Sequence, residues 1–365
     1  MKIMNRFTSE FRNHLRGCAN AMPRLVGMLG AIGVCMALSG PFLPEPASAQ
    51  TPVKFTLDWK WEGPSAPFIV AKEKGYFKAE GLDVTMDIGN GSREVIPRVA
   101  SGVYDIGSGE INSLIRFRDE NPDNDVKAVM IIYDRPAFSI IGRKSKNISA
   151  DLKSLQGKRF GAPTADGAFA QWPVFKAVNK IDDSSMKFDN VGFAIREAML
   201  VSGEFDAVFG FSISSYINLV GRGVAPDDLV TILMSDYGLE LYGNAIMVSP
   251  KFAAAKPEAI KGFLRAYMKG LKDTVADPPA AADFVVKYND VAKKDSELAR
   301  LKMAISQLMM TPFVRAQGYG GIDETRFDRA LDQIAIGAPF RRGKPKAADI
   351  FTAKYLPSGT DRRVE

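Results

Sequence analysis

Short runs of β-branched and aromatic residues alternate with stretches of helical period through the first two thirds of the chain. Glycine, proline and other turn residues separate the runs, and most gaps are long enough for a helix. Such alternation predicts an α/β fold with mainly parallel sheets and helices on both faces. The expected strands are residues 53–57, 82–88, 106–108, 126–133, 138–142, 159–162, 188–193, 207–211, 229–234 and 244–248.

The expected helices lie between these strands, and after residue 257 they follow one another without a strand. One of them contains Pro97, yet its apolar residues keep the helical period. The helices are predicted at residues 66–74, 92–101, 110–118, 168–178, 197–202, 214–220, 258–275, 279–288, 296–309 and 324–334.

The first 49 residues have the three parts of a secretory signal peptide. Basic side chains precede an apolar run at residues 25–38, and Ala47-Ser48-Ala49 offers small residues at the cleavage positions. We therefore expect cleavage before Gln50, a periplasmic location and no stable membrane insertion. An uncleaved anchor is disfavoured because the apolar run is shorter than the about 20 residues that a membrane helix needs.

All the histidine and cysteine of the chain lies in this predicted signal, as His14, Cys18 and Cys35. The exported protein would therefore contain no disulfide, no imidazole base and no thiolate nucleophile. Without these ligands only hard cations on Asp and Glu oxygens would remain as metals. We expect neither a metal nor another cofactor.

Charge and length exclude further classes. Loss of the signal leaves 316 residues with 43 basic and 40 acidic side chains, and no basic stripe with interleaved aromatic residues. Nucleic acid is therefore a poor candidate partner. A chain of this length is long enough to form two lobes with their own cores, and we expect a monomer.

Four motifs resemble one family of transport proteins. They are residues 71–84 (AKEKGYFKAEGLDV, preceded by Asp58-Trp59), 100–107 (ASGVYDIG), 155–161 (LQGKRFG) and 203–208 (GEFDAV). In order and spacing they are similar to motifs of the periplasmic substrate-binding proteins of ABC importers for nitrate, sulfonates, taurine and thiamine-precursor pyrimidines.

The resemblance implies a two-lobe periplasmic-binding-protein fold of type II. Residues 50–140 and 244–365 would form the first lobe, and residues 141–243 the second. Two hinge crossovers, at residues 138–142 and 242–246, would let the lobes close over a ligand. The implied partners are a small-molecule ligand and a complex of ABC permease and ATPase.

The ligand-binding residues are expected in the loops that follow the strands, because open α/β sheets bind ligands at the carboxyl ends of their strands. About one of the two tryptophans in the first of these loops is expected to face the cleft. Asp166 could bind the ligand or act only as the N-cap of the next helix. The candidates are Asp58, Trp59, Trp61, Glu62, Asn90, Ser92, Ser108, Glu110, Tyr133, Thr164, Asp166, Trp172 and Phe211.

The expected ligand chemistry follows from the acidic, basic and aromatic side chains of these loops. Carboxylates outnumber the nearby cations Lys60, Arg93 and Arg135, and carboxylates between aromatic faces suit a flat, nitrogen-rich donor. We therefore expect a small heteroaromatic ligand of the pyrimidine, thiamine-precursor type. The alternative is a sulfonate, taurine or nitrate anion. With no imidazole in the site, binding should vary little between pH 6 and pH 8 unless a carboxylate is strongly shifted.

Two other classes of protein compete with a binding protein. A carboxylate-only enzyme is chemically conceivable, and a ligand-sensing module of a membrane receptor is a second possibility. Eukaryotic relatives that make the thiamine pyrimidine use a histidine and a cysteine-rich motif, and the predicted exported chain has neither. We therefore expect that the protein is not an enzyme.

Overall fold

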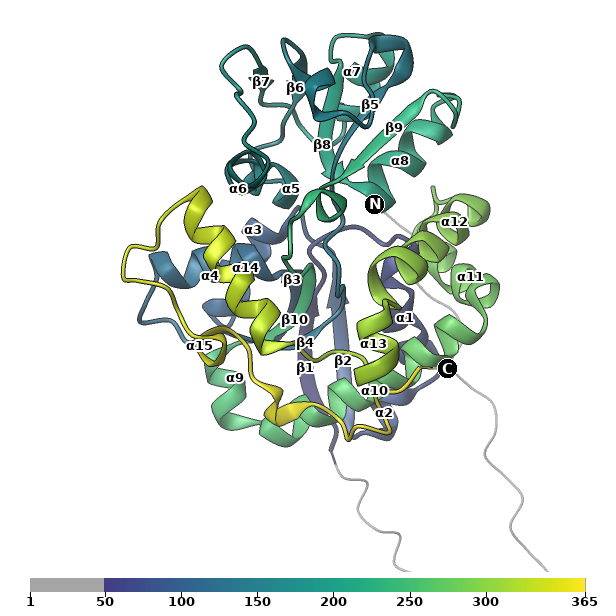
Figure 1. The fold of residues 1–365 in the computed structure, drawn as a ribbon. Helices are drawn as coiled ribbons and strands as arrows, with labels where there is room; N and C mark the ends of the chain where they lie inside the picture. Colours follow the sequence, from purple (N-terminus) through teal and green to yellow (C-terminus); the bar gives the residue numbers. More distant parts are fainter. Residues whose placement is uncertain (1–48, 365) are drawn as a thin grey trace, which may run out of the picture. The chain divides into compact units, whose positions relative to one another are not determined.

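The computed structural model describes residues 49–364, which contain two five-stranded sheets (Figure 1). The predicted signal peptide, including His14, Cys18 and Cys35, lies outside the described residues except for Ala49. Helices α1–α4 and α9–α15 accompany the first sheet in the sequence, and helices α5–α8 the second. We call these two groups of elements the first and the second lobe.

Each sheet contains four parallel strands and one antiparallel strand. The first sheet has the order β2-β1-β3-β10-β4, and β10 runs antiparallel to both neighbours. The second has the order β7-β6-β8-β5-β9, and β5 is the antiparallel strand. The prediction of mainly parallel sheets is confirmed. The strands are β1 Thr51–Thr56, β2 Leu82–Asp87, β3 Ile106–Glu110, β4 Lys127–Ile131, β5 Phe138–Arg143, β6 Arg159–Gly161, β7 Lys187–Asp189, β8 Ala207–Phe211, β9 Leu229–Leu233 and β10 Asn244–Val248.

The chain crosses between the sheets twice, through residues 132–137 and residues 234–243. The expected hinge stretches therefore lie largely within β5 and β10, and the connecting residues directly precede them. Arg326 contacts both connections. Its guanidinium donates hydrogen bonds to the carboxylate of Asp134 at 2.9 Å and to the carbonyls of Glu240 at 3.1 Å and Leu241 at 2.9 Å.

The first lobe is held by close packing of α10 on α1, where aromatic rings stack beneath β1. The rings of Phe55 and Phe68 lie 4.6 Å apart and those of Phe77 and Phe263 4.8 Å apart. Gly270 allows the two helices to approach, because a Cβ atom there would lie 2.2 Å from the carbonyl oxygen of Pro67. The helices of this lobe are α1 Ala66–Glu73, α2 Tyr76–Ala79, α3 Ser92–Ala100, α4 Ile111–Glu120, α9 Pro250–Ala255, α10 Pro257–Ala276, α11 Pro278–Tyr288, α12 Lys294–Ala304, α13 Pro312–Gln317, α14 Glu324–Gly337 and α15 Ala347–Ile350.

Three predicted elements differ from the structure. The helix expected at 168–178 is divided into α5 Gly167–Ala170 and α6 Trp172–Val178, because Pro173 cannot donate a hydrogen bond back to the preceding turn. The strand expected at 188–193 is only β7, since the residues after it turn toward the other lobe. The helix expected at 296–309 is α12 followed by a π-helical turn, Ile305–Met309.

The second lobe is completed by α7 Arg196–Ser202 and α8 Ser212–Gly221. Two helices of the first lobe pack directly on the second, α12 on α8 and α14 on α6 (Figure 1). Gly337 at the end of α14 lies against Val174 of α6. Among the described residues no helix is both long and apolar enough to cross a membrane.

Candidate ligand-binding site

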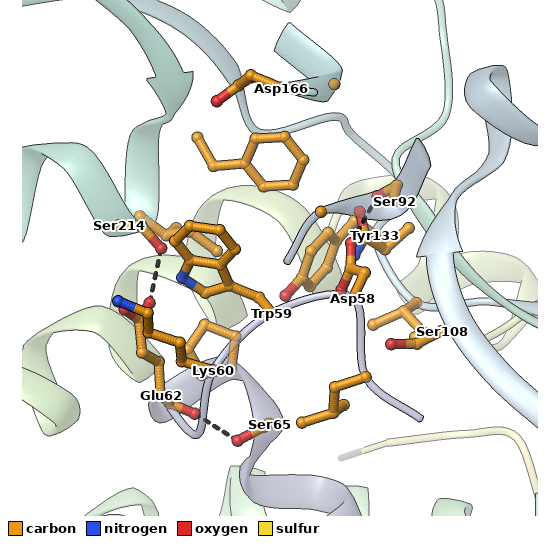
Figure 2. Close-up of a pocket in the computed structure, with 18 of the residues that line it drawn as sticks. Asp58, Trp59, Lys60, Glu62, Ser65, Ser92, Ser108, Tyr133, Asp166 and Ser214 are labelled. Carbon is orange, nitrogen blue, oxygen red and sulfur yellow. Dashed lines mark hydrogen bonds between the residues drawn. The ribbon is translucent and has the colours of Figure 1, made fainter. Parts of the chain in front are cut away.

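A pocket with an empty volume of about 780 Å³, part of it open to solvent, lies between the two lobes (Figure 2). Its walls come from the loops after β1, β2, β4 and β6 and from the first turns of α7 and α8. The residues that line it are Leu57, Asp58, Trp59, Lys60, Glu62, Pro64, Ser65, Phe68, Gly91, Ser92, Ser108, Ile132, Tyr133, Ala165, Asp166, Gly167, Phe193, Arg196, Phe211, Ile213, Ser214 and Asn244.

Asp58 is one of the buried carboxyl groups that line this pocket. One of its oxygens accepts hydrogen bonds from the hydroxyl of Ser92 at 2.7 Å and from the side-chain amide of Asn244 at 2.9 Å. Burial raises the pKa of Asp58, although these donors act in the opposite direction. A carboxyl group in this setting can accept a ligand N–H when ionised and can donate a hydrogen bond when protonated.

Aromatic rings from both lobes form the walls. The ring of Trp59 meets that of Phe193 edge-on, with centroids 4.9 Å apart, and Lys60 places its ammonium 5.5 Å from the Trp59 ring. Trp59 Nε1 and Asn244 Oδ1 are buried and have no hydrogen-bond partner among the described residues. Both atoms belong to residues that line the pocket, so its walls contain a donor and an acceptor without a protein partner beside flat apolar faces.

A buried ion pair borders the pocket on the side of the second lobe. Arg196 donates to Asp166 at 2.8 Å and to Glu197 at 2.6 Å. Asp166 also accepts the backbone N–H of Ala168 at 2.7 Å, so it is the N-cap of α5 as well as a lining residue. Burial raises the pKa of Asp166, and the Arg196 charge opposes this shift. The positive charge of Arg196 is thus compensated by two carboxylates.

Glu62 belongs to a second buried cluster at the edge of the pocket. It accepts a hydrogen bond from the Ser214 hydroxyl at 2.7 Å, and the guanidinium of Arg300 lies 3.3 Å from the same oxygen. Figure 2 shows this hydrogen bond between Glu62 of the first lobe and Ser214 of the second.

Most of the residues predicted from the sequence lie in the pocket. Those that line it are Asp58, Trp59, Glu62, Ser92, Ser108, Tyr133, Asp166 and Phe211. Those that lie outside its lining are Trp61, Asn90, Glu110, Thr164 and Trp172.

The two tryptophans outside the lining have structural contacts. Trp61 packs edge-on against Tyr288 of α11, with ring centroids 5.1 Å apart. Trp172 lies within the aromatic core of the second lobe, where its Nε1 donates to Asp183 at 2.9 Å. Of the two tryptophans after β1, Trp59 is therefore the one in the pocket.

The polar residues outside the lining also have local roles. Glu110 caps α4 by accepting the backbone N–H groups of Asn112 at 2.6 Å and Ser113 at 2.7 Å. Burial raises the pKa of Glu110 to about 7, which makes it a strongly shifted carboxylate next to the site. Asn90 is exposed, and the carbonyl of exposed Thr164 accepts a hydrogen bond from Arg93 of the opposite lobe at 3.1 Å.

Several lining residues were not predicted from the sequence. Asn244 stands at the amino end of β10, and because β10 is antiparallel this end lies at the carboxyl edge of its parallel neighbours. A rule that searches only behind parallel strands misses it. Phe193 and Arg196 follow β7 at a distance of several residues, so only the fold brings them to the pocket.

Comparison with known proteins identifies the family to which this chain belongs. The family model described as NMT1/THI5 like matches residues 63–281. The chain belongs to this family. The riboflavin-binding protein RibY of Chloroflexus aurantiacus is 26% identical over 302 residues, which cover 81% of this chain and 83% of RibY. The formylaminopyrimidine-binding protein of Halalkalibacterium halodurans is 27% identical over 247 residues, covering 66% and 71%.

Enzymes also occur among the relatives of this NMT1/THI5-like chain. The 4-amino-5-hydroxymethyl-2-methylpyrimidine phosphate synthase of Aspergillus parasiticus is 26% identical over 249 residues, covering 66% of this chain and 71% of the synthase. The resemblance predicted from the motifs is confirmed. The prediction that the protein is not an enzyme stays a prediction, because relatives are named both as binding proteins and as synthases.

Solved structures confirm the predicted fold class. The periplasmic aliphatic sulphonate binding protein SsuA of Escherichia coli matches with a TM-score of 0.63 at 12% identity, over 82% of this chain and 96% of SsuA. The periplasmic nitrate-binding protein NrtA of Synechocystis matches with a TM-score of 0.63 at 13% identity, over 84% and 87%. The chain has the two-domain periplasmic-binding-protein fold.

Proposed function

We propose that this protein is the solute-binding component of an ABC importer and that it captures a small, uncharged heteroaromatic molecule between its lobes. The observation that carries the proposal is the carboxyl group of Asp58, buried in a pocket with aromatic walls, where Trp59 Nε1 and Asn244 Oδ1 also lack a partner among the described residues. A nitrogen heterocycle with an N–H or amino group offers a donor to this carboxyl group and a flat face to the aromatic rings.

The charges of the pocket favour this ligand class over the anions. Arg196 is compensated by Asp166 and Glu197, and Lys60 is the remaining lysine or arginine of the lining. An anion would also lie near the carboxyl groups of Asp58 and Glu62. A dedicated anion site usually offers uncompensated positive charge or several free N–H groups. Nitrate, taurine and other sulfonates are therefore the second choice.

The names of the relatives agree with a flat heterocyclic ligand. One is named for binding riboflavin and another for binding formylaminopyrimidine, and both molecules carry a pyrimidine ring. We propose the thiamine-precursor type first, because an aminopyrimidine is a donor that suits the carboxyl group of Asp58.

The proposed mode of action is capture, closure and delivery. The two lobes would close over the ligand through the connections at 132–137 and 234–243. The closed monomer would then dock on a permease and its ATPase at the periplasmic face. Export through a signal peptide cleaved before Gln50 is part of this proposal.

Isothermal titration calorimetry tests the ligand class. The probes are 4-amino-5-hydroxymethyl-2-methylpyrimidine, its formylamino counterpart, riboflavin, taurine and nitrate. We expect micromolar or tighter binding of at least one heterocycle and none of the anions. Asp58→Asn should weaken that binding about tenfold or more, because a charge-assisted hydrogen bond is lost. Binding of the anions alone would refute the proposal.

Mass spectrometry of the recovered ligand tests whether the protein converts the heterocycle that it binds. A binding protein returns the heterocycle unchanged after long incubation. A changed mass would show turnover and would refute the role of a binding protein.

A further inference from the structure

Arg300 of α12 reaches from the first lobe into the second. Its guanidinium donates to the carbonyl oxygens of Ile213 and Ser214, each at 3.1 Å, and to the side-chain oxygen of Asn218 at 3.2 Å. All three acceptors belong to α8, the helix that begins at the pocket. One side chain thus contacts two turns of a helix in the opposite lobe.

The same guanidinium is held by carboxylates of its own lobe. It donates to Glu297 at 3.1 Å and lies 3.3 Å from Glu62, and the side chain of Arg300 is only 4% exposed. Glu297 in turn accepts the backbone N–H of Gly63 at 2.7 Å, which fixes the loop that carries Glu62. These contacts orient Arg300 toward α8 within a site that excludes water.

Glu62 joins this cluster to the ligand pocket. It lines the pocket and also accepts the hydroxyl hydrogen of Ser214 from the second lobe. A displacement of the loop after β1, where Glu62 lies, would therefore be transmitted to α8 through two groups, the Ser214 hydroxyl and the Arg300 guanidinium.

We propose that Glu62, Glu297 and Arg300 form a latch that holds the lobes together, with Arg300 as a positioning residue for α8. Separation of the lobes breaks the hydrogen bonds to Ile213, Ser214 and Asn218, whereas the ion pairs within the first lobe persist. Arg300 therefore keeps carboxylate partners in the separated arrangement, and the latch can open without leaving an unpaired buried charge. Its effect on ligand residence time rests on the proposed function, but its effect on lobe separation does not.

Two variants test the latch at different strengths. Ser214→Ala removes the hydroxyl donor from the second lobe and leaves every charge in place. Arg300→Lys keeps the charge but cannot contact two carbonyls and two carboxylates at once, because an ammonium lacks the planar fork of a guanidinium. Arg265→Lys is the matched control, since Arg265 pairs at 2.6 Å with Glu80 of its own lobe.

Lobe separation is measured by pulsed electron paramagnetic resonance on the full chain. Spin labels are attached to Lys78→Cys in α2 and Lys187→Cys in β7, both at exposed positions, in a background with Cys18 and Cys35 replaced by serine. Without ligand, we expect Ser214→Ala and Arg300→Lys to shift the distance distribution toward longer distances. The control should match the unmodified sequence.

Ligand release supplies the second readout. For the heterocycle that binds in calorimetry, the dissociation rate should rise about fivefold in Ser214→Ala, as expected for one hydrogen bond, and more in Arg300→Lys. Distances that stay unchanged in both Ser214→Ala and Arg300→Lys, even with lower melting temperatures, would overturn the latch and leave the cluster a purely structural one. If no heterocycle binds, the proposed function is refuted. The distances measured without ligand still test whether the latch holds the lobes together.

Discussion

Glu110 should make the stability of this protein depend on pH. The side chain is fully buried at the start of α4, and burial raises its pKa from an ordinary 4.5 to about 7 despite the N–H donors of Asn112 and Ser113. Between pH 4.5 and about pH 7, Glu110 therefore keeps a proton in the folded state that it has released in the unfolded chain. The contribution of this bound proton to the free energy of unfolding is fully present below pH 4.5. It is lost as the pH rises through 7.

The size of the effect follows from the two pKa values. Proton linkage for one group with a pKa of 4.5 unfolded and about 7 folded gives roughly 2.5 kcal/mol between pH 5 and pH 8. Burial also raises the pKa values of Asp58 and Asp166, so the pH dependence of the unmodified protein alone would not isolate the contribution of Glu110. The difference in unfolding free energy between the unmodified protein and Glu110→Gln isolates it, because the other groups titrate in both proteins.

Urea unfolding followed by circular dichroism, without ligand, measures this difference at pH 5, 6, 7 and 8. The stability advantage of the unmodified protein over Glu110→Gln should decrease by about 2.5 kcal/mol from pH 5 to pH 8. Glu258→Gln, at a side chain that is 77% exposed, is the control. An advantage that stays constant across the four pH values would refute the reasoning.

Three further predictions concern packing, the site and the connections. Gly270→Ala should lower the free energy of unfolding by about 3 kcal/mol in urea titrations, because its Cβ would clash with the Pro67 carbonyl. Trp59→Phe should weaken heterocycle binding about tenfold in calorimetry through loss of the free N–H, whereas Trp61→Phe should change the affinity less than about twofold. Arg326→Lys should destabilise the fold by about 2 kcal/mol, measured by urea unfolding, because its fork spans both connections. Unchanged stability in Arg326→Lys would show that the connections do not need it.

Much of the fold could be predicted because its signals are local. Hydrophobic period and turn residues placed every strand of both sheets near its observed position. Errors arose where a local signal was ambiguous. Pro173 divides a helix whose apolar period continues past it, and the strand predicted to continue to residue 193 ends at Asp189, after which Phe193 contacts Trp59 of the other lobe.

The site was predicted less completely, because a loop can be identified from sequence while the direction of its side chains cannot. Trp59 and Trp61 stand in the same loop, yet one borders the pocket and the other packs on Tyr288. Glu110 has the position of a ligand residue at the end of β3, but its carboxylate is used to cap α4. Neither outcome has a signal in the neighbouring residues.

Local patterns in the chain were enough to predict two mainly parallel sheets, the family motifs, and loops rich in carboxylates and aromatic residues after the strands. These properties depend on residues close together in the chain. Which groups meet depends instead on the tertiary fold. It joined Asp58 to Asn244 across 186 positions, and it brought Arg300 to Ile213 of the other lobe, because antiparallel β10 and the C-terminal helices return late segments to the early ones. The pocket with its free donor and acceptor, and the latch beside it, result from that return.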